Sequence, residues 1–82
     1  MDIHSVIFEI LQELEQKLNE EDVLRAREYL SYNENGVAFE LICTQIIEYE
    51  LKVSRNVFDK LNWIAKEMRL QADFLEKIVI DE

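Results

Sequence analysis

Apolar residues in this chain recur at intervals of three and four positions, which is the spacing of one face of an α-helix. The pattern is clearest near the start of the chain, where it comprises Ile3, Val6, Ile7, Ile10, Leu11, Leu14 and Leu18. The 82 residues contain no proline and a single glycine, so little in the sequence interrupts helix formation. The spacing therefore predicts an all-α protein, a compact bundle of four to five short helices.

The chain length limits this bundle to one domain. Dividing 82 residues between two compact units would leave each too short to enclose a core without metals or disulfides. Cys43 is the only cysteine, which excludes an intramolecular disulfide, and its place in an apolar helical pattern predicts a buried side chain. We therefore expect residues 1–82 to form a single helical domain.

Capping residues mark the second helix and the turn after it. Asn19 is a candidate N-cap for a helix that extends to about Leu30, and the acids at positions 20–22 complement the positive end of its dipole. Residues 32–36 (YNENG) then hold two Asn and the only Gly, which are residue types that accept a positive φ. We therefore expect the break between the second and third helices in this turn.

Two longer helices and a shorter one follow the turn. Residues 37–49 are apolar around most of the helix circumference, which is typical of a central helix. Residues 51–53 indicate a short extended connection, and Ser54 is a candidate N-cap for the fourth helix. Trp63 lies beside the apolar stripe of that helix, either at the edge of the core or exposed for binding. A fifth helix is expected to begin near Gln71 and to close the open end of the bundle.

The charge of the chain is concentrated at one end. Residues 1–50 hold twelve acids against Lys17, Arg25 and Arg27, whereas residues 51–82 hold six acids and six bases, so the net charge of −9 lies in the first fifty residues. A one-ended excess of this kind produces a directed field that attracts a cationic partner and repels the phosphate backbone of nucleic acids. The alternative is that these acids only solvate the helix surfaces.

The residue clusters that support catalysis are missing from the sequence. One Gly cannot supply a phosphate-binding loop, and His4, the sole histidine, lies near the N-terminus, where no second group is expected to hold it as a general base. Zinc sites need several Cys and His side chains, and the chain has one of each. We therefore expect no catalytic residues, no cofactor, no metal and no small-molecule substrate, and we do not expect an enzyme.

The N-terminal residues Met-Asp-Ile-His-Ser lack the basic region and the cleavage site of a secretory signal. The apolar residues are spread at helical intervals and form no run of membrane length. With 49% hydrophobic and 33% charged residues, the chain is also too apolar to be disordered. These features predict a folded cytoplasmic protein with no membrane partner.

Several stretches of the chain carry a recognisable pattern: residues 33–43 (NENGVAFELIC), 46–50 (IIEYE), 53–54 (VS) and 61–68 (LNWIAKEM). An Asn-Glu turn, an Ala-x-Glu-Leu helix and a helix that ends in Ala-x-x-Met resemble the MafI-like immunity proteins. These are small helical partners of toxins in the polymorphic and contact-dependent growth-inhibition systems of bacteria. The resemblance covers roughly residues 20–75. The family typically has a Gly after the Met, where this chain has Arg69.

The resemblance implies a cytoplasmic, non-enzymatic, acidic protein that binds and neutralises a cognate toxin, which in related systems is often a basic nuclease domain. A nuclease needs a cationic groove for its polyanionic substrate, and an acidic protein can occupy that groove or a neighbouring basic patch. The alternative is an acidic helical adaptor or regulatory subunit with an unrelated protein partner.

The expected partner-binding surface lies in the acidic half of the chain, where carboxylates would attract the partner and exposed tyrosines would anchor it. It comprises Glu20, Glu21, Asp22, Tyr32, Asn33, Glu34, Glu40, Glu48, Tyr49 and Glu50.

Overall fold

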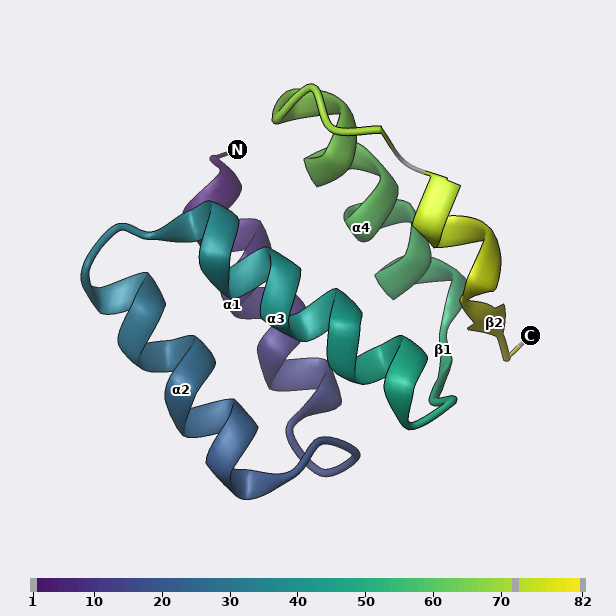
Figure 1. Ribbon diagram of the computed structural model, residues 1–82, viewed down its shortest axis with the longest axis horizontal. Helices are drawn as coiled ribbons and strands as arrows, with labels where there is room; N and C mark the ends of the chain where they lie inside the picture. Colours follow the sequence, from purple (N-terminus) through teal and green to yellow (C-terminus); the bar gives the residue numbers. More distant parts are fainter. Residues whose placement is uncertain (1, 72, 82) are drawn as a thin grey trace.

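The computed structural model describes residues 2–71 and 73–81 of the chain. Its elements are α1 (Ile3–Leu14), α2 (Glu20–Ser31), α3 (Asn35–Glu48), β1 (Lys52–Val53), α4 (Arg55–Glu67), the 3-10 helix η1 (Asp73–Lys77) and β2 (Val79–Ile80). Helix α2 packs against α3, and α1 lies behind them and contacts α2, α3 and α4 (Figure 1). The predicted all-α bundle of short helices is therefore confirmed.

Side-chain caps start the helices at the expected places. Asn19 accepts a hydrogen bond from the backbone N–H of Glu21 at 2.8 Å, and Ser54 accepts one from that of Val57 at 3.1 Å. Asp2 caps α1 in the same way. Each of these bonds satisfies an N–H that has no partner inside its helix. Both caps predicted from the sequence, Asn19 and Ser54, are confirmed.

Helices α2, α3 and α4 end in the same motif, in which the residue after the C-cap adopts a left-handed conformation. Asn33, Glu50 and Arg69 take this position with φ of 59°, 51° and 56°. After α4, for example, the N–H of Leu70 donates to the carbonyl of Ala65 at 2.9 Å. This bond pattern satisfies carbonyls at the helix end, and it favours glycine because a Cβ is strained at positive φ.

Gly36 does not have the turn-forming role that the sequence indicated. It lies inside α3 and does not have a positive φ, and Asn33 supplies the left-handed residue of the turn instead. Arg69, in contrast, stands where the MafI-like pattern has a glycine, and its backbone has the conformation that glycine prefers.

Replacing Arg69 by Gly is expected to raise the free energy of unfolding by about 0.5–1.5 kcal/mol, because glycine relieves the left-handed strain while losing some chain entropy on folding. Urea unfolding monitored by circular dichroism measures this change. The matched control is Lys66→Gly, inside α4, which should lower stability by about 1 kcal/mol. If Arg69→Gly lowers the free energy of unfolding as much as Lys66→Gly does, the assignment of Arg69 to this motif is wrong.

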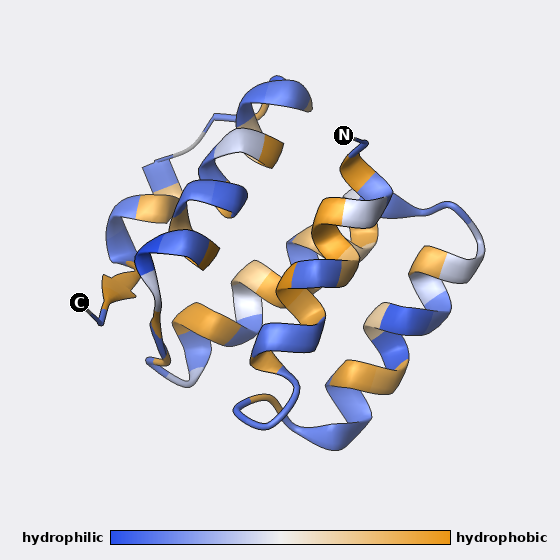
Figure 2. Ribbon diagram, turned by 180° about the vertical axis from the view of Figure 1, so that it is seen from behind, coloured by the Kyte–Doolittle hydropathy of each residue, from blue (hydrophilic) through white to orange (hydrophobic). Residues whose placement is uncertain are grey.

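The hydrophobic core joins all four α-helices and β1. The most deeply buried large side chains are Val6, Ile7, Ile10, Leu11, Phe39, Ile42, Ile46, Val53, Val57, Leu61 and Ile64. Cys43 is buried, as predicted, and Trp63 is half-buried against the edge of the core, which decides between its two predicted placements. Apolar and polar segments alternate along the helices, as expected for elements with one buried side (Figure 2).

Two boundaries differ from the prediction. Helix α1 ends at Leu14 and not at Leu18, because the chain then forms turns, in which the N–H of Glu15 donates to the Gln12 carbonyl and that of Lys17 to the Leu14 carbonyl, each over three residues. Leu18 is nevertheless buried. The predicted fifth helix is the 3-10 helix η1, and the chain then forms β2, which pairs in parallel with β1 in the predicted extended connection.

Candidate partner-binding surface

One side of α3 forms an exposed strip in the described part of the chain. Val37, Glu40, Thr44 and Glu48 follow one another at intervals of three and four residues, and all are exposed. We call these residues the α3 face. Ala38, Ile42 and Ile46 lie on the opposite side of the helix and are buried. The polar side chains of this face, Glu40, Thr44 and Glu48, are therefore accessible.

The acids on α1 are largely neutralised by basic residues from other helices. The Lys60 ammonium of α4 lies 3.2 Å from the carboxylate of Glu9 and 3.6 Å from that of Glu13. The Arg27 guanidinium of α2 pairs with Glu15, which follows α1, at 3.0 Å. These partly exposed pairs add little stability, but they remove negative charge from the α1 side of the molecule.

The acids around α3 keep their charge unpaired. Within residues 2–71 and 73–81, no salt bridge involves Glu34, Glu40, Glu48 or Glu50, and all four are exposed. Among the described acids of the N-terminal half, exposed carboxylates without a salt bridge therefore lie on the α3 face and at both ends of α3, and Glu20 and Glu28 of α2 add to them.

Two exposed tyrosines flank this acidic region. Tyr32 is the C-cap of α2, in the turn before α3, and is 69% exposed; Tyr49 is the C-cap of α3 and is 52% exposed. They lie at opposite ends of α3, about 20 Å apart along a helix of this length. Asn33, beside Tyr32, is exposed and provides the left-handed turn residue.

The start of α2 contributes less to the candidate partner-binding surface than the sequence predicted. Because α2 and α3 are joined by a short turn and lie side by side, they run antiparallel, and Glu20 and Glu21 lie at the Tyr49 end of α3 (Figure 1). Glu21 pairs with Arg25 at 3.7 Å. Asp22 was expected on the surface, but it is 9% exposed, because it points inward in the first turn of α2. We therefore remove Asp22 from the candidate surface.

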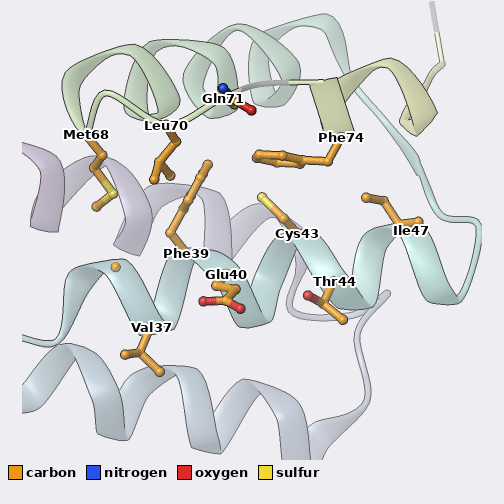
Figure 3. A pocket seen from close by; sticks show the side chains of 11 residues that line it. Val37, Phe39, Glu40, Cys43, Thr44, Ile47, Met68, Leu70, Gln71 and Phe74 are labelled. Carbon is orange, nitrogen blue, oxygen red and sulfur yellow. The ribbon is translucent and has the colours of Figure 1, made fainter.

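A groove that the sequence did not predict lies beside the α3 face. It has a volume of about 530 Å³ and runs between α3 and the segment from the end of α4 to η1. Figure 3 shows Phe39 and Cys43 pointing from α3 toward this segment, where Phe74 meets them. The rings of Phe39 and Phe74 pack edge to face with their centroids 6.3 Å apart.

The mouth of the groove is apolar with an acidic edge. Val37 is 43% exposed on one side, and Leu70 is 45% exposed on the other. Among the described residues that line the groove, Glu40 is the only charged one. Met68 and Phe74 line the groove and are half-buried. The groove therefore joins the apolar core to the α3 face.

Cys43 lies in the wall of the groove but is only 4% exposed. Burial raises the pKa of its thiol to about 12, because the surrounding apolar side chains disfavour the charged thiolate. The thiol is therefore protonated at neutral pH and is a poor nucleophile. The geometry supports a packing role for Cys43.

Metal-ligating side chains do not gather anywhere in the described part of the chain: no group of three His, Cys, Asp or Glu could hold an ion there. Among the same residues, no helix is both long enough and apolar enough to span a bilayer. The features that stand out are thus the unpaired acids of the α3 region, the two tyrosines and the groove.

Comparison of the chain with protein-family models, with curated proteins and with solved structures found no match.

Proposed function

We propose that this chain is an immunity protein, which binds a cognate bacterial toxin with a cationic nuclease domain and neutralises it. The observation that carries the proposal is the group of unpaired carboxylates at α3, next to exposed tyrosines and an apolar groove. The motifs shared with the MafI-like immunity proteins support the same class of partner. In this account the chain does no chemistry and acts by occupying the toxin surface.

The unpaired state of the α3 acids favours a cationic partner. A carboxylate that already pairs with Lys or Arg must give up that pair to bind another cation, whereas Glu40 and Glu48 form no such pair with any residue that the structure describes. Their field extends about 8–10 Å into physiological salt and raises the rate of productive encounters. A nuclease presents the complementary cations, because its own substrate is a polyanion.

Apolar contacts would supply most of the affinity once the two proteins meet. Buried aromatic anchors usually dominate the binding energy, while charges at the rim set the association rate. Tyr32 and Tyr49 offer large, stiff side chains at the ends of α3. The proposed interface thus combines steering by acids with anchoring by tyrosines.

The alternative is an acidic helical adaptor or regulatory subunit, which would use the same surface for an unrelated cationic protein. The surface chemistry alone does not separate the two functions. A neighbouring reading frame that encodes a large secreted protein with a variable C-terminal toxin region is expected for an immunity protein and not for an adaptor.

Co-expression with the toxin domain from the adjacent upstream gene tests the proposal. We expect the two chains to co-purify as a stable complex, and an equimolar amount of this chain to abolish the nuclease activity of the toxin. A toxin domain from an unrelated system is the control and should remain active. Full nuclease activity in the presence of excess chain, together with no complex, would contradict the proposed function.

A further inference from the structure

We propose that the groove between α3 and the α4–η1 segment receives the apolar side of an amphipathic, basic helix from the protein partner. The proposal rests on the proposed function for the source of that helix, which is the toxin, and it adds where and how the partner binds.

The length of the groove suits a helix. Its α3 wall extends from Gly36 to Ile47, which corresponds to about 16 Å or three helical turns. A helix bound in such a groove typically inserts apolar anchors at positions i, i+3 or i+4, and i+7. The volume of about 530 Å³ is large enough for several such side chains.

The residues that line the groove favour apolar side chains in the bound helix. Phe39, Cys43 and Phe74 form the inner part of the groove, and Val37 and Leu70 present exposed apolar surface at its mouth. Water in contact with these groups is released when an apolar side chain replaces it, which is the main source of affinity for such a site. A polar segment would leave its hydrogen-bonding groups unsatisfied here.

The charge around the groove selects a basic helix and orients it. Glu40 lies at the mouth on the α3 side (Figure 3). Glu48 is exposed two turns further along the α3 face. Arg69, which stands between Met68 and Leu70 in the sequence, is exposed but does not line the groove. Lysine or arginine residues of the bound helix should therefore face α3. A second copy of this chain is a poor occupant, because each copy carries a net charge of −9.

Two further hollows, beside α2, share Arg27 in their linings and are less suited to a cationic segment. Arg27 already pairs with Glu15, and its guanidinium lies 5.9 Å from the ring centroid of Phe8. A cation arriving there meets an existing positive charge, whereas the described lining of the α3 groove contains none.

Filling the groove without a change of charge tests the proposal. Thr44 is exposed and lines the groove, so Thr44→Trp should obstruct it and weaken toxin binding at least about tenfold. Gln12→Trp is the matched control, since Gln12 is exposed on α1 outside the groove, and it should bind as the unmodified chain does. Leu70→Ser, which removes apolar surface at the mouth, should also weaken binding. Circular dichroism checks that each variant is folded.

A synthetic peptide provides a readout that does not depend on the toxin. The probe is a helical peptide of roughly four turns with Leu at every third or fourth position and Lys beside them. In NMR spectra of the labelled chain, we expect shift changes at Val37, Thr44, Leu70 and Phe74. A peptide with Glu in place of Lys should cause none.

The two experiments distinguish a failure of the groove proposal from a failure of the proposed immunity function. If the chain neutralises the toxin but Thr44→Trp and Leu70→Ser, both folded, bind as tightly as Gln12→Trp, the groove proposal is overturned and the immunity function stands. If the chain does not neutralise the toxin while the Lys peptide still shifts the groove residues, the immunity function fails and the groove remains a site for basic helices. Peptide shifts confined to α1 and α2 overturn the groove proposal.

Discussion

The Cys43 thiol is expected to react with a thiol reagent roughly a thousand times more slowly in the folded protein than in the unfolded chain at pH 8. The reagent attacks the thiolate, and burial raises the pKa of this thiol from its ordinary value of 9.0 to about 12. Each pKa unit reduces the thiolate fraction about tenfold well below the pKa. The 4% exposure of Cys43 slows access further.

The pH dependence of labelling follows from the same shift. Between pH 8 and 11 the rate for the unfolded chain should level off once the pH exceeds about 9, whereas the rate for the folded protein should keep rising. Labelling with and without denaturant, followed by mass spectrometry, measures both rates. The control is Cys43→Ala/Thr44→Cys, which moves the thiol one residue to an exposed position and should react rapidly.

Rapid labelling of Cys43 in the native protein would show that the thiol lies at the surface. The orientation of α3 would then be the reverse of the one described, and Cys43 would not form the inner wall of the groove. The outcome therefore bears on the fold and on the binding proposal together.

The helices could be predicted from the sequence because their determinants are local. The apolar spacing from Val6 to Leu14 depends only on residues within a few turns, and so do the caps at Asn19 and Ser54. The near-continuous apolar surface of α3 correctly indicated a helix packed on more than one side. These features hold in almost any tertiary arrangement of the segments.

The groove could not be predicted, because it depends on how distant segments are placed. Phe39 and Phe74 are both apolar residues in helical patterns, and nothing in their spacing shows that a cavity opens between their elements. The 3-10 form of η1 and the pairing of β2 with β1 likewise depend on tertiary contacts. One feature of the sequence did point to the groove: Met68 and Phe74 lie at the ends of their apolar helical patterns, where burial is often incomplete.

The candidate surface could be predicted only in part for a related reason. The division of charge between the two halves of the chain located the acidic excess, but Lys60 from the balanced half reaches across to Glu9 and Glu13. The sequence therefore did not indicate which acids remain unpaired. Asp22 shows the same limit, because its burial depends on the way α2 packs.

Reversing the charge of the α3 face is expected to slow association with the toxin about tenfold to a hundredfold at low salt. The variant is Glu40→Lys/Glu48→Lys, which changes two exposed acids that form no salt bridge within residues 2–71 and 73–81. Electrostatic steering acts mainly on the association rate, so the dissociation rate should change less. The difference from the unmodified chain should fade as salt rises, because salt screens exposed charges.

A control variant distinguishes the effect of where the charge is reversed from the effect of the changed net charge. Glu67→Lys/Glu76→Lys alters the net charge by the same amount, at exposed residues in α4 and η1 outside the groove lining. If steering depends on the α3 face, this control should retain an association rate close to that of the unmodified chain. Circular dichroism shows that both variants are folded before rates are compared.

The association rate of these two variants with the toxin domain, measured by stopped flow from low to high salt, tests most directly the claim that the α3 face receives a cationic partner. At low salt we expect slow association for Glu40→Lys/Glu48→Lys and a near-normal rate for Glu67→Lys/Glu76→Lys. At high salt the rate for Glu40→Lys/Glu48→Lys should approach that of the unmodified chain. If both folded variants associate equally fast, or if only Glu67→Lys/Glu76→Lys is slow, the partner binds elsewhere and the claim is wrong.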